Sequence, residues 1–174
     1  MEIPPGVQAS IAGKTIVIKG PKGELKRDMP SKRIMMEVKE NKMILSAKDA
    51  TKNDKRMIGT FEAHVKNMLR GAVNCHVYRL KICSGHFPIN VSYSNNEFVV
   101  KNFLGEKIPR ILKIKKDVTV KLEGSDVTVE SFNKELAGQT AAEIEKLTAI
   151  KGRDIRVFQD GIYITEKDGK KIME

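Results

Sequence analysis

Residues 16–24 read IVIKGPKGE, and residues 98–106 read FVVKNFLGE. In both stretches three apolar residues precede a lysine, Lys19 or Lys101, and a Gly-Glu pair follows at the same distance. Apolar, β-branched runs that end at glycine, proline or asparagine are typical of a β-strand followed by a turn. The chain of 174 residues therefore contains the same strand and turn twice.

A second pair of matching segments follows the first. Residues 34–47, IMMEVKENKMILSA, match residues 118–131, VTVKLEGSDVTVES. In each segment apolar and polar residues alternate on both sides of a polar pair, Glu40-Asn41 or Gly124-Ser125. A period of two is the pattern of a half-buried antiparallel strand, so each segment is predicted to form a hairpin.

A helical segment follows each hairpin. The first has its apolar stripe at Met57, Phe61, Val65, Met68 and Leu69, and the second at Leu136, Thr140, Ile144 and Leu147. These spacings indicate amphipathic helices, capped by Asn53 or Asp54 in the first copy and by Asn133 in the second.

Both predicted helices also contain a glycine at the matching position, Gly59 or Gly138. A glycine inside a helix costs up to about 1 kcal/mol relative to alanine. Its recurrence therefore predicts close packing of each helix on its sheet.

Three matching blocks in the same order indicate a tandem duplication. We predict an α+β protein with two homologous domains, residues 1–74 and 75–174, each a mainly antiparallel sheet with one packed helix. Within the second domain, residues 156–167, RVFQDGIYITEK, are predicted to form a last hairpin that turns at Asp160-Gly161.

The charge of the chain indicates its class of partner. It contains 32 Lys and Arg against 22 Asp and Glu, a net charge of +10, which attracts polyanions. A basic protein with no such partner is one alternative. An acidic membrane surface is another, but it requires an amphipathic helix with a basic face, and neither predicted helix is strongly basic.

Groups that could perform catalysis are scarce. The histidines His64, His76 and His86 have no metal-ligand spacing around them, and the two cysteines, Cys75 and Cys83, lie in strand-like sequence. No glycine-rich phosphate loop or nucleophile elbow is present. We therefore predict a protein that is not an enzyme and that uses no cofactor, metal or small-molecule substrate.

Two clusters of cations are the candidate binding residues. One contains Lys101, Lys107, Arg110, Lys113, Lys115 and Lys116, and the other contains Lys146, Lys151, Arg153 and Arg156. Isolated lysines usually form a solvated face, but clusters on turns favour phosphate contacts. Only 5 % of the residues are aromatic, so recognition of folded RNA by shape is favoured over stacking of single-stranded bases.

Four phrases of the sequence resemble a known family. They are VIKGPKGEL (17–25), HFPINV (86–91), KNFLGEK (101–107) and RDIRVFQDGIYITEK (153–167). With the duplicated layout, they resemble the L-six family of large-subunit ribosomal proteins, called L-nine in eukaryotes. The resemblance covers essentially the whole chain and is to the eukaryotic and archaeal branch.

The resemblance implies a cytoplasmic protein of the large ribosomal subunit. Its partners would be large-subunit ribosomal RNA near the sarcin–ricin loop and neighbouring proteins at the stalk base, with no membrane. RNA contacts would come from the regions matching Asn102–Lys107 and Lys151–Arg156. The candidate RNA-binding residues are Lys101, Asn102, Gly105, Lys107, Arg110, Lys113, Lys115, Lys151, Gly152, Arg153 and Arg156.

The distribution of charge complicates this expectation. Residues 1–80 contain 16 basic and 8 acidic residues, a net charge of +8, whereas residues 81–174 contain 16 and 14, a net charge of +2. A binding role confined to the second domain would leave most of the excess charge unused. A two-domain adaptor that binds acidic partners, outside the ribosome, is the alternative function.

Overall fold

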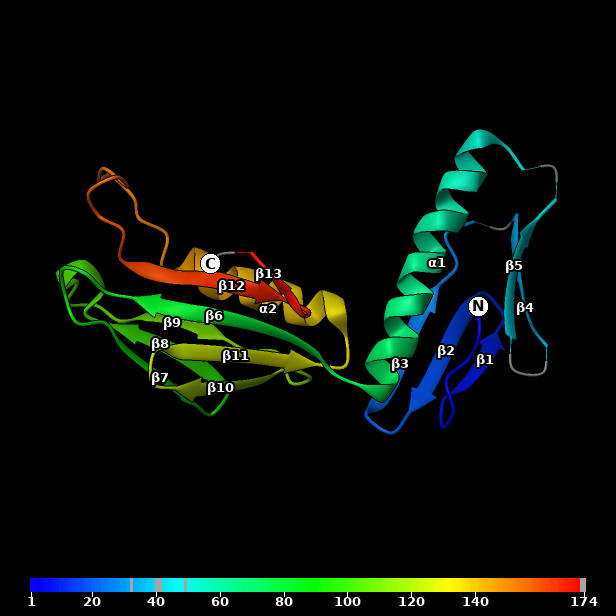
Figure 1. Cartoon of the computed structure of the whole chain (residues 1–174), viewed down its shortest axis with the longest axis horizontal. Helices are drawn as coiled ribbons and strands as arrows, with labels where there is room; N and C mark the ends of the chain where they lie inside the picture. Colours follow the sequence, from blue (N-terminus) through cyan, green and yellow to red (C-terminus); the bar gives the residue numbers. More distant parts are fainter. Residues whose placement is uncertain (32, 40–41, 49, 173–174) are drawn as a thin grey trace. The chain divides into compact units, whose positions relative to one another are not determined.

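The computed structural model describes residues 1–31, 33–39, 42–48 and 50–172, and it divides into two compact units (Figure 1). The first unit comprises Met1–Cys75 with Phe132–Lys134, and the second comprises His76–Ser131 with Glu135–Glu174. Among the described residues, no helix has the length and apolar character that a membrane crossing requires.

The first unit contains two antiparallel sheets and one helix. Strands β1 (Gln8–Ala12), β2 (Thr15–Gly20) and β3 (Gly23–Asp28) form a three-stranded meander, and β4 (Ile34–Lys39) pairs with β5 (Lys42–Ala47). The predicted turn of this hairpin, Glu40-Asn41, lies outside the described residues. Alternate residues of β4 are buried, as the period of two predicts: Ile34 is 3 % exposed and Met36 8 %.

Helix α1 (Lys52–Val73) packs its apolar stripe into the core of this unit. Phe61, Val65 and Leu69 are buried there with Ile16 and Ile18 of β2. The prediction that Asn53 or Asp54 caps this helix is wrong. The N-cap is Thr51, whose hydroxyl accepts the Asp54 N–H, while the Asp54 carboxylate accepts the Thr51 N–H at 3.0 Å. Asp54 therefore belongs to the first helical turn, as the second half of a capping box.

The second unit repeats this layout with additional strands. Strands β7 (Asn90–Ser94), β8 (Glu97–Lys101) and β9 (Arg110–Lys113) form the meander, with a single 3-10 turn, η1 (Phe103–Gly105), between β8 and β9. Strands β10 (Thr119–Glu123) and β11 (Asp126–Ser131) form the hairpin, and α2 (Lys134–Leu147) follows directly after Asn133.

The hairpin of this unit extends into a larger sheet of five strands. Its order is β10-β11-β6-β12-β13, where β6 is His76–Cys83, β12 is Gly161–Lys167 and β13 is Lys170–Lys171. The central strand β6 buries Tyr78 and Leu80 against Ala137, Ala141 and Ile144 of α2. The fold class predicted from the sequence, α+β with tandem homologous repeats, is therefore confirmed, and each unit divides its strands between two sheets.

The predicted hairpin turn at Asp160-Gly161 is wrong. Gly161 is already inside β12 and pairs with Cys83 of β6. The turn of the last hairpin lies at Asp168 and Gly169, which both adopt positive φ angles of 51° and 86°. Asp160 does not turn the chain because its buried carboxylate is held by another loop, as described below.

The two helix glycines differ in their surroundings. A Cβ atom added at Gly138 would lie 3.1 Å from the Tyr78 hydroxyl, so α2 packs closely on β6 at this point. A Cβ atom added at Gly59 would meet nothing within 4 Å. The predicted close packing therefore holds for the second helix and is wrong for the first.

Candidate nucleic-acid interface

Three loops of the second unit meet at one end of its sheets, where β6 ends and β12 begins (Figure 1). They are residues 84–89, 102–109 and 151–160, and together they are called the loop end. The Asn102 side chain donates to the Pro88 carbonyl at 3.0 Å, which joins the first loop to the second. The Gly85 N–H donates to the Asp160 carboxylate at 2.6 Å, which joins the first loop to the third.

Asp160 forms the connection between the first loop and the third. Its side chain is 1 % exposed and also accepts the N–H of His86 at 3.2 Å. Burial alone would raise the pKa of Asp160, but the hydrogen bonds from Gly85 and His86 hold it below its ordinary value. The carboxylate therefore remains ionised at neutral pH and ties two loops together, with the His86 ring 5.0 Å from that of Phe158.

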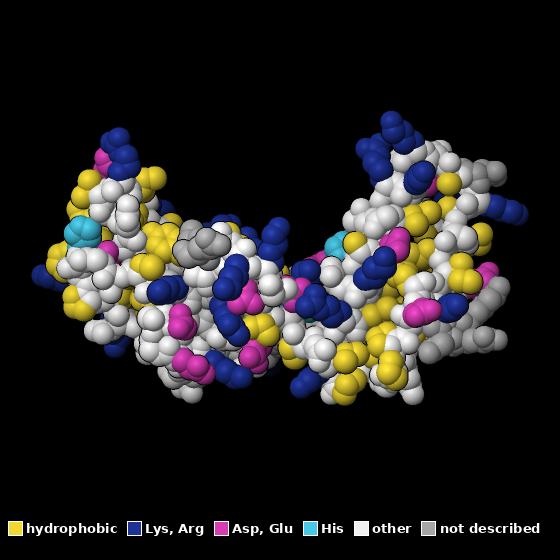
Figure 2. Space-filling view, in the orientation of Figure 1, with side chains coloured by type: hydrophobic (Ala, Val, Ile, Leu, Met, Phe, Trp, Pro, Cys, Tyr) yellow, Lys and Arg dark blue, Asp and Glu magenta, His cyan; other side chains and the backbone are white. Residues whose placement is uncertain are grey.

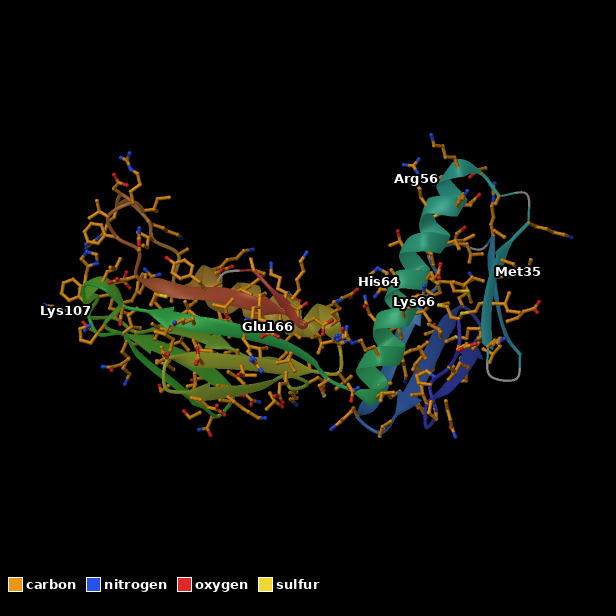
Figure 3. All side chains as sticks on the ribbon, in the orientation of Figure 1. Met35, Arg56, His64, Lys66, Lys107 and Glu166 are labelled. Carbon is orange, nitrogen blue, oxygen red and sulfur yellow. The ribbon has the colours of Figure 1, made fainter. Side chains whose placement is uncertain are left out.

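The loop at residues 102–109 has an unusual backbone. Asn102 and Leu104 adopt positive φ angles of 58° and 49°, and Gly105 follows at 79°. Phe103 and Leu104 are buried and anchor the loop, whereas the segment from Gly105 to Pro109 is exposed. Lys107 therefore projects from a loop whose base is fixed in the core (Figure 3).

Arg110 holds this loop from its far side. The guanidinium donates to both Glu106 carboxylate oxygens, at 2.6 and 2.8 Å, and to the Leu147 carbonyl at 2.6 Å. It also lies over the Phe103 ring, 4.4 Å from the centroid. Hydrogen bonding from Arg110 lowers the pKa of Glu106. Arg110 is thus half-buried and engaged with its own chain, in a position to orient the loop.

The third loop presents the other cluster of cations. Gly152 has a φ of +70°, and Arg153 lies over the Phe158 ring at 4.9 Å. Arg156 is exposed and donates through two nitrogens to Asp154, at 2.8 and 3.1 Å. This exposed ion pair pre-orders a guanidinium at the surface, where it retains access to solvent.

The structure brings most of the predicted site residues together and separates two. At the loop end lie Asn102, Gly105, Lys107, Lys151, Gly152, Arg153 and Arg156, and it is flanked by Lys101 at the end of β8 and Arg110 at the start of β9. Lys113 lies at the other end of β9, paired with Glu97 rather than with the loops. Lys115 follows β9 and donates to the Gln139 side chain of α2 at 2.8 Å. Ile114, which lies between them, is buried.

The loop end also exposes apolar side chains that the sequence analysis did not select. Ile108 is 80 % exposed, Ile155 68 % and Val157 59 %, and Phe87 is beside them in the first loop. Figure 2 shows hydrophobic and cationic side chains next to one another at this end. In the sequence, Ile108 and Ile155 can be recognised as single apolar residues between charged or proline neighbours, in KIPR and RDIR.

A cavity of about 560 Å³ opens beside Asp160 at the loop end. Cys83, His86 and Tyr163 line it with Asp160. In the described part of the chain, no group of three or more His, Cys, Asp or Glu side chains is placed to hold a metal ion.

Fold and site together define a class of protein. Loops with pre-ordered cations and exposed apolar side chains, supported by a rigid α+β unit, are typical of proteins that bind folded RNA and neighbouring proteins. The family model described as ribosomal protein L6 matches residues 3–72 and 87–161. The chain belongs to the ribosomal protein L6 family.

Similar proteins extend the match over nearly the whole chain. Large ribosomal subunit protein uL6 of Methanococcus vannielii is 42 % identical over 170 residues, which cover 98 % of this chain and 93 % of the relative. The proteins of the same name from Methanosarcina mazei and Methanobrevibacter smithii are also 42 % identical, over 96 % and 97 % of this chain and 95 % and 94 % of the relatives. The resemblance seen in the sequence is confirmed. The prediction that the protein is not an enzyme is confirmed as well, because the relatives are ribosomal proteins.

Proposed function

We propose that this member of the L6 family is a structural protein of the large ribosomal subunit in the cytoplasm, and that its loop end binds ribosomal RNA near the sarcin–ricin loop and the stalk base. The family and the archaeal relatives support the assignment to the large subunit. The location on the RNA follows from the resemblance of residues 101–107 and 153–167. Residues 1–74 and 75–174 are proposed as its two domains.

The observation that carries the proposal is the gathering of cations from two distant segments. Lys107 belongs to the loop before β9, whereas Lys151, Arg153 and Arg156 precede β12, and the fold places both loops at one end. Phosphates of folded RNA are separated by several ångströms, so neutralising several of them requires cations on more than one loop. A pre-ordered loop also loses less conformational freedom when it binds.

The roles of the individual residues follow from their contacts. Lys101, Lys107, Lys151, Arg153 and Arg156 contact phosphates, and Gly105 and Gly152 allow close approach of the backbone. Arg110 and Asn102 act mainly by positioning the loop at residues 102–109, since both are hydrogen-bonded within the chain. Lys113 and Lys115 contact RNA at the edge of the site, away from the loop end.

The exposed apolar residues have a separate role in this proposal. Ile108 and Ile155 contact neighbouring ribosomal proteins at the stalk base, because burial of an exposed aliphatic side chain in a protein interface contributes roughly 1.5–3 kcal/mol. RNA phosphates alone would give such side chains no partner.

Sedimentation of a cell lysate tests the assignment to the ribosome. The tagged protein should migrate with the large subunit on a sucrose gradient at moderate salt and should be released only at high salt, as charge neutralisation requires. Migration in the light fractions at low salt would instead support the adaptor that binds acidic partners.

A crosslinking experiment tests the location. A photo-crosslinking amino acid in place of Ile108 or Ile155 should label RNA or protein near the sarcin–ricin loop and the stalk base. Labels that map elsewhere on the large subunit would refute the proposed location and leave the assignment to the subunit intact.

A further inference from the structure

The first unit contains a groove that the proposed function does not use. Its volume is about 380 Å³, and it lies between the end of β3 and the first four turns of α1. The polar side chains that line it are Arg27, Asp28, Asn53, Arg56, Thr60 and His64. Two arginines from two different elements therefore converge on one groove.

The geometry of α1 explains why its residues converge there. Arg56, Thr60 and His64 are spaced by four residues, so they lie one above another on the same face of the helix. Figure 3 shows Arg56 and His64 on α1, two turns apart. Pro30, Met57 and Phe61 supply an apolar surface in the same groove.

Cations dominate the surroundings of the groove. Lys52 and Lys55 are exposed in the first turn of α1, and among the described residues neither they nor Arg56 forms an ion pair. Figure 2 shows the Lys and Arg side chains gathered at this end of the helix. Positive potential therefore extends from the groove over the beginning of α1.

The acidic residues nearby are already engaged. Asp28 accepts the Thr15 hydroxyl at 2.5 Å, and Asp54 is held by the Thr51 cap with Arg33 at 3.7 Å. Two arginines, Arg27 and Arg56, face one carboxylate, Asp28, in the lining of the groove, so the net charge of the lining is positive. This accords with the net charge of +8 over residues 1–80, which the loop end of the second unit does not use.

The chemistry of the lining favours an RNA backbone as the occupant. Arginine presents a planar fork of donors that matches phosphate oxygens, and asparagine, threonine and histidine add further donors. Pro30 and Met57 offer an apolar surface to a ribose or a base edge. A peptide of acidic residues alone, such as polyglutamate, would use the cations but would leave this apolar surface without a partner.

We propose that the groove formed by Arg27 and Arg56, between β3 and α1, is a second RNA-binding site that holds the phosphodiester backbone of a ribosomal RNA segment. The first unit then contributes directly to assembly on the RNA, and the protein contacts RNA through both units.

The test measures binding of the full-length protein to a labelled RNA duplex over a range of salt concentrations. The groove variant is Arg27→Gln with Arg56→Gln. The matched control is Lys22→Gln with Lys42→Gln, which removes the same charge from the turn before β3 and from the first residue of β5. A third variant, Lys107→Ala with Lys151→Ala, probes the loop end. Thermal unfolding verifies that each variant folds, and Arg56→Gln alone replaces the double variant if that one does not.

The groove variant should bind RNA about tenfold more weakly, and the slope of log affinity against log salt concentration should become shallower by about two. The control variant should change RNA affinity less than twofold. Equal losses in the groove variant and the control, or no loss in either, would overturn the inference. Loss of binding to a labelled polyglutamate peptide with unchanged RNA binding would overturn it in favour of a protein partner. The third variant is independent: if it alone loses RNA affinity, the proposed function stands and the second site fails.

Discussion

Asp160 connects two loops of the second unit through a single buried carboxylate. Its oxygens accept the backbone N–H groups of Gly85 and His86, at 2.6 and 3.2 Å. A hydrogen bond to a charged group contributes roughly 1.5–3 kcal/mol. The relative position of the two loops therefore depends on one residue.

Asp160→Ala should lower the free energy of unfolding by about 2 kcal/mol at pH 7, because two backbone N–H groups lose a charged acceptor. The pKa of Asp160 is lowered in the folded state, so the stabilisation by its charge is present above the ordinary pKa, roughly 4, and is lost as the pH falls through the folded value. Urea unfolding at several pH values measures this: the difference between wild type and variant should shrink below pH 4. A difference that is constant down to pH 2 would contradict the role of the ionised carboxylate. Asp160→Asn, which keeps an acceptor oxygen, should cost less.

Arg110 shows how a residue that resembles a binding cation can act as a support. Arg110→Lys keeps the charge but cannot hold Glu106 and the Leu147 carbonyl together. Hydrogen exchange of residues 102–109 should become faster, and RNA affinity should fall about three- to tenfold. Unchanged exchange in that loop with an equal loss of affinity would show that Arg110 contacts RNA directly.

At the scale of elements, the start of α1 depends on its capping box. Thr51→Ala removes the side-chain acceptor of the Asp54 N–H and should lower stability by about 1 kcal/mol. Thr51→Ser retains the hydroxyl and should remain close to the wild type. Chemical denaturation measures both variants, and equal stability of the alanine and serine variants would exclude the cap as a source of stability.

Alanine substitutions at the two helix glycines should affect stability differently. Gly59→Ala should raise the free energy of unfolding by about 0.5–1 kcal/mol, because the added methyl meets no atom and alanine favours the helix. Gly138→Ala should leave stability unchanged or lower it, because the methyl would lie 3.1 Å from the Tyr78 hydroxyl. Thermal unfolding compares the two variants. A gain at Gly138 as large as the gain at Gly59 would show that the contact with Tyr78 relaxes without cost.

At the scale of the whole molecule, the position of each cation determines how much it contributes to RNA affinity. Lys107→Ala with Lys151→Ala should weaken binding to large-subunit RNA about tenfold, because both lysines extend from the loop end. Lys113→Ala with Lys115→Ala removes the same charge from the other end of β9 and should weaken binding less. Filter binding at fixed salt compares the two pairs. Equal losses would mean that overall charge, and not the loop end, determines affinity.

The local features of this chain follow from its sequence. Alternating residues in β4 and β10 are buried on one side because a strand presents successive side chains to opposite faces. The repeated order of strand, hairpin and helix is confirmed because each unit must bury the same apolar positions. The phrases that resemble the L6 family also lie in the sequence itself, and the family is confirmed through them.

Features that depend on distant partners do not follow from the sequence. The motif DGIY reads as a turn, but Asp160 binds backbone N–H groups 74 and 75 residues away, so Gly161 enters a strand instead. The cap of α1 depends instead on local backbone conformation: Thr51 is extended and its hydroxyl reaches Asp54, whereas Asn53 looks equally suitable in the sequence.

The same distinction applies to function. The sequence by itself determined the family, the α+β class and the two cationic clusters, because local composition and period encode them. Only the tertiary structure decided that Lys107 and Lys151 share one end, that Arg110 supports a loop, and that Arg27 and Arg56 line one groove. The reason is physical: phosphate recognition depends on where charges meet in space, and pairing of strands far apart in the chain determines where they meet.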